Sequence, residues 1–171
     1  MPAITAAASD GFITYQNASL GVKFTYPKNW TVFPLTEGQY YGVGPYRFDD
    51  NLTMIAFYVD NNGAYKSSND TYTTLNYINS IISAYKSSPS QFSNFTLLQN
   101  ATPATLGGLP AYEIRFSYNY SFDARHPLLL GKQICATRGD SIYGIIYAGP
   151  PKYYNRSLSA ADQIINSFQF I

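Results

Sequence analysis

The sequence predicts a single domain of the α+β class, and three observations support this prediction. The chain has 171 residues, a length that fits one hydrophobic core. Segments that alternate apolar and polar residues, as half-buried strands do, recur along the chain. Apolar residues at helical spacing occur in two stretches, one near the middle and one at the C-terminal end. We therefore expect antiparallel strands combined with two helices.

The first third of the chain predicts strands. Val22–Tyr26 alternates apolar and polar residues, and Pro27–Trp30 interrupts this pattern before a short second strand over Thr31–Phe33. Leu52–Val59 is a nearly continuous apolar run, typical of a buried strand, and ends at the turn signal Asp60–Gly63.

The middle of the chain predicts a helix and two further strands. The helical pattern lies between Asp70, the expected N-cap, and Lys86, and Pro89 follows its end. Its apolar residues at helical spacing are Leu75, Ile78, Ile82 and Tyr85. A short strand is expected over Phe95–Leu98 and a longer one over Ala111–Phe122. The apolar face of the longer strand would carry Ile114, Phe116, Tyr118, Tyr120 and Phe122.

The last third predicts a hairpin and a closing helix. Two strands, Leu128–Ala136 and Ile142–Ala148, flank a turn at Gly139 and Asp140. Ser159–Asp162 resembles a capping box of the S-x-x-D kind. The apolar stripe of the closing helix comprises Tyr154, Leu158, Ala161, Ile165 and Phe168.

The composition predicts a neutral, polar surface around a sizeable core. Hydrophobic residues make up 46% of the chain and charged residues only 12%, about half of the usual share. The chain contains 17 Tyr, whose rings are amphipathic and can be half buried. The net charge of +1 gives no basic footprint for nucleic acid, so a nucleic-acid partner is not expected.

Glycan acceptor triplets of the form Asn-X-Ser/Thr are unusually frequent. The sequence has eight of them, whereas a random order of the same residues would give about two. We therefore expect a secreted, N-glycosylated protein with acceptors at Asn17, Asn29, Asn51, Asn69, Asn94, Asn100, Asn119 and Asn155. Asn119 stands on the polar face of its strand, where a glycan would point to water. The alternative is that a surface rich in Ser, Thr and Asn forms such triplets without being glycosylated.

Other features of the sequence agree with a location at the cell exterior. A lone cysteine, Cys135, forbids an internal disulfide and is expected to be a small buried hydrophobe. Together with the acceptor triplets, this points toward an archaeal cell exterior. No run of 18 apolar residues is present, so no membrane span is expected. The first eleven residues are too short and too polar for a signal peptide, which suggests a mature start from which a leader or anchor was removed.

An ordered series of segments resembles the PsbP-like family. The series comprises "NASLGVKFTYPKNWTV", a central helix, "LGGLPAYEIRFSY", "GKQICATRGDSIYGIIYAGPPKYY" and "ADQIINSFQF". The resemblance runs from about Tyr15 to Phe170, so we expect residues 1–14 to be a tail and residues 15–171 to be the domain. It implies an α/β/α sandwich around a central antiparallel sheet of about six strands. It also implies an accessory binding or assembly factor rather than an enzyme, with no catalytic residues and no cofactor.

The residues that carry this resemblance have structural explanations. Tyr26 and Trp30 are expected in the core, and Phe168 should pack the closing helix on the sheet. Gly107 and Gly108 are expected in a turn that requires positive φ.

Catalytic and metal-binding patterns are weak. Cys135 and His126 would lie about 25–30 Å apart along an extended strand, too far to act together. His126 with Asp123 forms at most a peripheral metal site, and otherwise His126 is a solvated loop residue. Asp49 and Asp50 beside Asn51, or Asp60 with Asn61 and Asn62, lack the ligand number of a calcium loop. Glu37 and Glu113 do not suggest the facing carboxylates of a glycosidase. No metal site is predicted.

An aromatic stretch is the candidate partner-binding region. Glycines and Pro45 predict a loop that would display the residues of this aromatic patch, Tyr40, Tyr41, Tyr46, Arg47 and Phe48. The alternative is that these rings pack in the core or over the sheet.

The sequence thus predicts a non-catalytic extracellular domain that binds a protein partner or a cell-envelope assembly. Two alternatives remain. One is a structural subunit of an extracellular filament or surface layer, with the segment "ITAAASDGFITY" as a donated strand. The other is a hydrolase acting on glycans or peptides, which would need a concave pocket with at least two facing ionisable groups.

Overall fold

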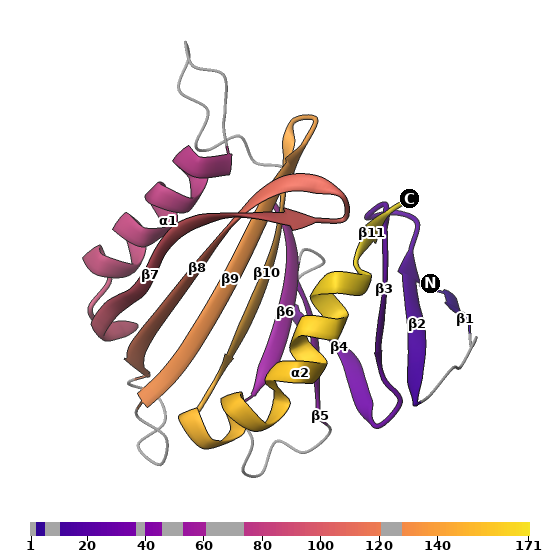
Figure 1. Cartoon of the computed structure of the whole chain (residues 1–171), viewed down its shortest axis with the longest axis horizontal. Helices are drawn as coiled ribbons and strands as arrows, with labels where there is room; N and C mark the ends of the chain where they lie inside the picture. Colours follow the sequence, from indigo (N-terminus) through magenta and orange to yellow (C-terminus); the bar gives the residue numbers. More distant parts are fainter. Residues whose placement is uncertain (1–2, 6–10, 37–39, 46–52, 61–73, 121–127) are drawn as a thin grey trace.

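The computed structural model describes residues 3–5, 11–36, 40–45, 53–60, 74–120 and 128–171. These residues form two antiparallel sheets and two helices (Figure 1). The α+β class predicted from the sequence is therefore confirmed. Within the described segments, neither helix is both long enough and apolar enough to cross a membrane.

The larger sheet has seven strands in the order β4-β5-β6-β10-β9-β8-β7, and each neighbouring pair is antiparallel. At the predicted hairpin turn between β9 and β10, Gly139 has a φ of 59°, a conformation that glycine adopts without strain. The strands are β4 (Trp30–Thr36), β5 (Tyr40–Pro45), β6 (Met54–Asp60), β7 (Phe92–Leu106), β8 (Leu109–Tyr120), β9 (Leu128–Arg138) and β10 (Ser141–Gly149).

The smaller sheet stands beside the larger one and has the order β1-β2-β3-β11 (Figure 1). It consists of β1 (Ala3–Thr5), β2 (Phe12–Asn17), β3 (Val22–Pro27) and β11 (Gln169–Phe170). Part of the expected tail, residues 1–14, thus contributes β1 and the beginning of β2 to this sheet. Because β11 pairs with β3, the two ends of the described chain belong to the same sheet.

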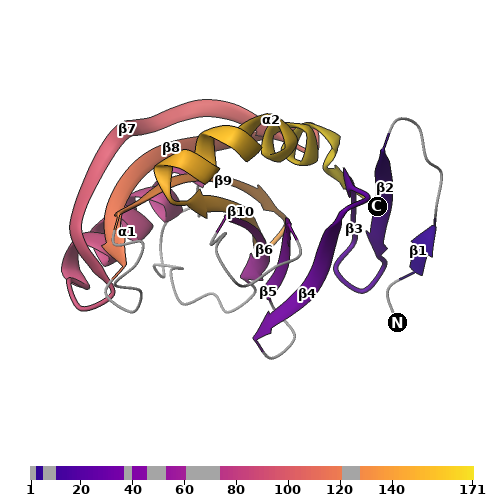
Figure 2. The same cartoon turned by 90° about the horizontal axis from the view of Figure 1, so that it is seen from below.

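The two helices cover opposite faces of the larger sheet. Figure 2 shows this sheet as a curved layer, with α1 (Thr74–Ser87) on its concave side and α2 (Pro151–Ser167) on its convex side. This is the sandwich arrangement that the family resemblance implied. Ile78 and Ile82, two residues of the predicted apolar stripe, are buried in α1. The expected cap Asp70 lies outside the described residues.

Helix α2 begins earlier than the capping-box pattern suggested. Pro150 precedes the helix and Pro151 opens it, a position that proline tolerates because the first N–H groups of a helix have no intrahelical partner. The Pro150 carbonyl accepts hydrogen bonds from the backbone N–H groups of Tyr153 and Tyr154. Ser159–Asp162 therefore lies inside the helix, and its interpretation as a cap is wrong.

The core has two parts, one on each side of the larger sheet. The first lies against α2 and the smaller sheet and contains Tyr26, Trp30 and Phe168, as predicted. The Phe168 ring centroid is 5.5 Å from that of Phe57 on β6. The second part lies beneath α1 and contains Ile114, Phe116 and Tyr118, three members of the predicted apolar face of β8. The predicted turn between β7 and β8 is also confirmed, because Gly107 and Gly108 have φ of 58° and 82°.

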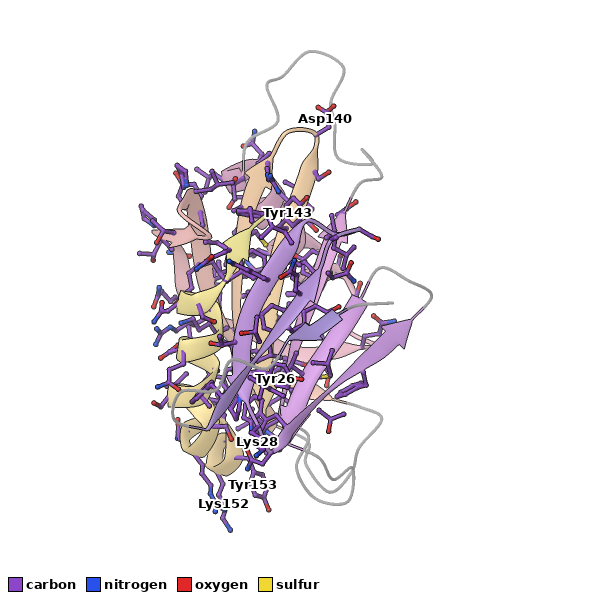
Figure 3. All side chains as sticks on the ribbon, turned by 90° about the vertical axis from the view of Figure 1, so that its right-hand side faces the viewer. Tyr26, Lys28, Asp140, Tyr143, Lys152 and Tyr153 are labelled. Atoms are coloured by element: carbon purple, nitrogen blue, oxygen red, sulfur yellow. The ribbon has the colours of Figure 1, made fainter. Side chains whose placement is uncertain are left out.

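Charged side chains mark the two ends of the described structure. Lys28, in the turn after β3, lies at the same end as Lys152 and Tyr153 at the start of α2 (Figure 3). Asp140, in the turn between β9 and β10, lies at the opposite end (Figure 3). The Lys152 ammonium stands 5.7 Å from the centroid of the Tyr153 ring, within the range of a cation–π contact.

Candidate functional site

Six of the predicted glycan acceptors fall in the described residues. Asn29, Asn94, Asn100 and Asn155 are exposed, and Asn119 is partly exposed. Asn51 and Asn69 lie outside the described residues. Five acceptors on the turn after β3, on β7, on β8 and on α2 are thus open to solvent.

Asn17 differs from the other acceptors because it is part of the turn between β2 and β3. Its side-chain Nδ2 donates a hydrogen bond to the Tyr15 hydroxyl at 3.1 Å, and its Oδ1 accepts one from the Leu20 backbone N–H at 3.1 Å. The residue is only 7% exposed. N-glycosylation would attach a glycan to the same Nδ2, so the modified side chain would not fit this buried position.

The predicted aromatic patch falls partly in a strand. Tyr40 and Tyr41 belong to β5, whose backbone pairs with β4 on one side and β6 on the other. The expectation of a loop at these two positions is therefore wrong. Tyr46, Arg47 and Phe48 lie outside the described residues, so a partner-binding role for the patch stays a hypothesis.

A buried polar cluster lies between α1 and the larger sheet, and we define it by Tyr58, Tyr85, Gln133 and Cys135. The Gln133 amide donates a hydrogen bond to the Tyr58 hydroxyl at 2.7 Å and accepts one from the Tyr85 hydroxyl at 2.9 Å. The Tyr58 hydroxyl is also 3.2 Å from the Cys135 sulfur. Since Tyr85 belongs to α1 and the other three belong to the sheet, the cluster joins the helix to the sheet through polar groups.

Burial keeps two groups of this cluster, the Tyr58 hydroxyl and the Cys135 thiol, neutral. It raises the pKa of the Cys135 thiol to about 12, against a smaller lowering effect of the hydrogen bonds from Tyr58 and Gln133. Burial also raises the pKa of the Tyr58 hydroxyl well above its usual value. The thiolate is the nucleophilic form of cysteine, so Cys135 is inert at neutral pH. The prediction that Cys135 is buried is confirmed.

These pKa values predict that the protein loses stability in alkaline solution. Above the ordinary thiol pKa of 9.0, the unfolded chain releases the Cys135 proton while the folded chain keeps it up to a pKa of about 12. The unfolded state then binds fewer protons, so the free energy of unfolding falls with rising pH between these two values. Urea unfolding from pH 7 to pH 11 measures this change.

A Cys135→Ala variant is the control for the alkaline experiment. It should show a shallower decrease over the same pH range, although Tyr58 still contributes above its ordinary pKa of 10.0. In the native protein at pH 8, Cys135 should react with a thiol reagent far more slowly than in urea. Equal reaction rates in the two states would contradict the buried cluster.

A charged cluster lies between α2 and strands β8 and β9, and we define it by Glu113, Arg115, Lys132 and Asp162. The Lys132 ammonium is 3.0 Å from Glu113 Oε2 and 3.0 Å from Asp162 Oδ1. The Arg115 guanidinium donates to the other Glu113 oxygen at 2.9 Å. This hydrogen bond is the largest cause of the raised pKa of Arg115.

The charged cluster follows from strand register and helix packing. Glu113 and Arg115 are two residues apart on β8 and share a face, and Arg115 is paired with Lys132 on β9. Asp162 reaches the same lysine from α2. Glu113 and Asp162 thus share one cation, a carboxylate pair that the sequence analysis missed because Asp162 was placed in a cap. Each carboxylate is already paired, which leaves neither as an unbound general base. Among the described residues, no group of three or more His, Cys, Asp or Glu side chains is arranged to hold a metal ion.

The chain thus forms a two-sheet α+β domain in which polar side chains bind one another on both faces of the larger sheet. The chain belongs to a known family of this class, because a model described as PsbP-like protein matches residues 5–170. The resemblance seen in the sequence is therefore confirmed. In a search of curated proteins, no match to the chain was found.

Solved structures share this fold at low sequence identity. Cyanobacterial PsbP from Synechocystis sp. PCC 6803 has a TM-score of 0.68 and 13% identity, over 99% of this chain and 98% of that one. LpqN of Mycobacterium tuberculosis, described as involved in cell envelope biogenesis, has a TM-score of 0.53 and 13% identity, over 99% and 88% of the two chains. A protein of Bacteroides thetaiotaomicron reaches a TM-score of 0.51 at 10% identity, over 88% of this chain and 45% of that one. At such identities the likeness concerns the fold alone.

Proposed function

We propose that this chain is a non-catalytic accessory domain of the cell exterior, which carries N-linked glycans and binds a protein partner or a cell-envelope assembly. The observation that carries the proposal is the exposure of the acceptor asparagines at positions 29, 94, 100, 119 and 155. A surface on which acceptors recur in a turn, on strands and on a helix is suited to glycosylation in a secretory environment. The involvement of the structurally similar LpqN in cell envelope biogenesis agrees with this proposal.

The charged cluster favours a binding domain over a hydrolase. A hydrolase needs ionisable groups that are free to exchange protons with a substrate. Glu113 and Asp162 are both held by Lys132, and the Cys135 thiol is protonated and buried. For the filament alternative, the N-terminal segment was the candidate for a donated strand, and Ala3–Thr5 of this segment pairs with β2 of its own chain.

Glycosylation is tested by mass spectrometry of the native protein. The intact mass should exceed the sequence mass of 19.0 kDa by several glycans. Peptide mapping should find glycans at Asn94, Asn100 and Asn119, and should find Asn17 unmodified because its Nδ2 is buried and bonded to Tyr15. Asn17 serves as the internal control, since it has the same triplet but a different environment. An unmodified native mass would remove the argument for an exterior location.

Partner binding is tested at the aromatic patch. Replacing Tyr41 and Tyr46 by Ser should weaken association with the native partner by about 2 kcal/mol or more, as truncations of interface tyrosines do. The partner is first purified with the native protein by cross-linking, and its affinity is then measured by calorimetry. Unchanged affinity, or an unfolded variant, would mean that the rings do not form a binding surface.

A further inference from the structure

Strand β7 forms one edge of the larger sheet and lacks the charged side chains that commonly protect an edge. It is 15 residues long and, among the strands that the structure describes, pairs only with β8 (Figure 1). None of its residues, "FSNFTLLQNATPATL", carries a charge. Edge strands expose unpaired backbone groups, and charged side chains commonly prevent them from pairing with other chains.

An apolar side chain lies exposed on this edge strand. Leu98 is 57% exposed, the highest value among the exposed large hydrophobic residues of the described structure. Shifts in the pairing with β8, between Ser93 and Thr96 and twice more before Thr102, disturb the regularity of the strand. Such irregularities hinder edge pairing in part. They leave the Leu98 side chain in solvent.

Two predicted glycan acceptors flank Leu98 on the same strand. Asn94 and Asn100 are both exposed, and Asn94 has a φ of 54°, which turns the backbone locally at the first pairing shift. At about 3.3 Å per residue they stand within about 13 Å of Leu98 along the strand. Glycans at both positions would place bulky, solubilising groups on either side of the exposed leucine.

We propose that N-linked glycans on Asn94 and Asn100 shield the β7 edge from pairing with the β7 edge of a second copy of this chain. The proposal rests on the proposed function, since it requires the glycans. It assigns these two acceptors the protective role that charged residues have on other edge strands.

The test compares glycosylated proteins secreted from the same glycosylating host. In sedimentation velocity, the wild type should remain monomeric, whereas the variant Asn94→Gln/Asn100→Gln should shift to dimers and larger species. Asn155→Gln is the matched control, because it removes an acceptor from the exposed side of α2 rather than from a sheet edge. This control should sediment like the wild type.

A third variant shows whether β7 is the surface that associates. Adding Leu98→Lys to the double glutamine variant places a charge on the edge and should restore the monomer. Circular dichroism checks that each variant is folded. A monomeric double variant, or association that Leu98→Lys does not reverse, overturns the shielding role while leaving the proposed glycosylation intact. Unmodified Asn94 and Asn100 in a wild type that carries glycans elsewhere would overturn the shielding role alone, whereas an unmodified native mass would overturn both proposals, which separates the two failures.

Discussion

Replacing Gly144 by Ala should lower the free energy of unfolding by about 3 kcal/mol, the upper part of the usual range for overpacking a core. Gly144 lies in the middle of β10, where it pairs with Tyr58 of β6 and Cys135 of β9. A Cβ at this position would collide with the Tyr58 ring and its hydroxyl oxygen. The ring cannot move aside easily, because it is 3% exposed and its hydroxyl accepts the hydrogen bond from Gln133. Urea unfolding measures the loss.

A double-mutant cycle tests whether Tyr58 is the cause of this loss. Tyr58→Val removes the ring, so Gly144→Ala should cost much less in the Tyr58→Val background than in the wild type. The difference is the coupling energy, and residues in direct contact give values of about 0.5–3 kcal/mol. Additive effects, or wild-type stability of the single Gly144→Ala variant, would show that the close approach of Tyr58 to β10 is not as described.

Some elements could be predicted because a pattern of a few neighbouring residues is enough to indicate them. The hairpin of β9 and β10 follows from alternation on both sides of Gly139, and the turn at Gly107 and Gly108 follows from two adjacent glycines. The start of α2 was predicted less well. Ser159 and Asp162 have the spacing of a capping box, but the helix begins earlier, at the two prolines at positions 150 and 151. A spacing rule does not distinguish a cap from two residues on one face of a helix.

Strand β5 shows how tertiary pairing overrides local preference. Gly42, Gly44 and Pro45 favour a loop when the segment is considered alone. In the structure the segment pairs with β4 and β6, which lie on either side of it along the chain. The backbone pairing available from two neighbours outweighs the weak strand preference of the glycines.

The two polar clusters could not be predicted, because they depend on contacts between distant segments. Tyr58 and Cys135 are separated by 77 residues and meet only because β6 and β9 both pair with β10. Lys132 and Asp162 meet only when α2 packs on the convex face of the sheet. Glycan acceptors, in contrast, are local triplets and are visible in the sequence. Their burial is not visible, so Asn17 could not be distinguished from the others.

The charged cluster gives the second large prediction. Replacing Lys132 by Met should lower the free energy of unfolding by about 2–3 kcal/mol, because two carboxylates would lose their shared cation. The Glu113 side chain is only 14% exposed, and water would replace the lysine poorly there. The Asp162 side chain is 43% exposed, so water can solvate its carboxylate once the ion pair with Lys132 is gone. The expected effect is therefore smaller than for a fully buried pair.

Two further variants separate the contribution of each carboxylate. Asp162→Asn should lower the free energy of unfolding by less than about 1 kcal/mol. Lys132 keeps its ion pair with Glu113 in this variant, and the Asp162 side chain is partly open to water. Adding Glu113→Gln to Lys132→Met should recover part of the loss, because the Glu113 oxygen that faced the Lys132 ammonium is then no longer charged, although Arg115 would lose its charged acceptor. Urea unfolding at pH 7 compares these variants and the single Glu113→Gln variant with the wild type. Two outcomes would show that the ammonium does not hold α2 to the sheet through these carboxylates. One is a Lys132→Met variant as stable as the wild type. The other is a Glu113→Gln change that lowers the free energy of unfolding by the same amount in the Lys132→Met variant as in the wild type.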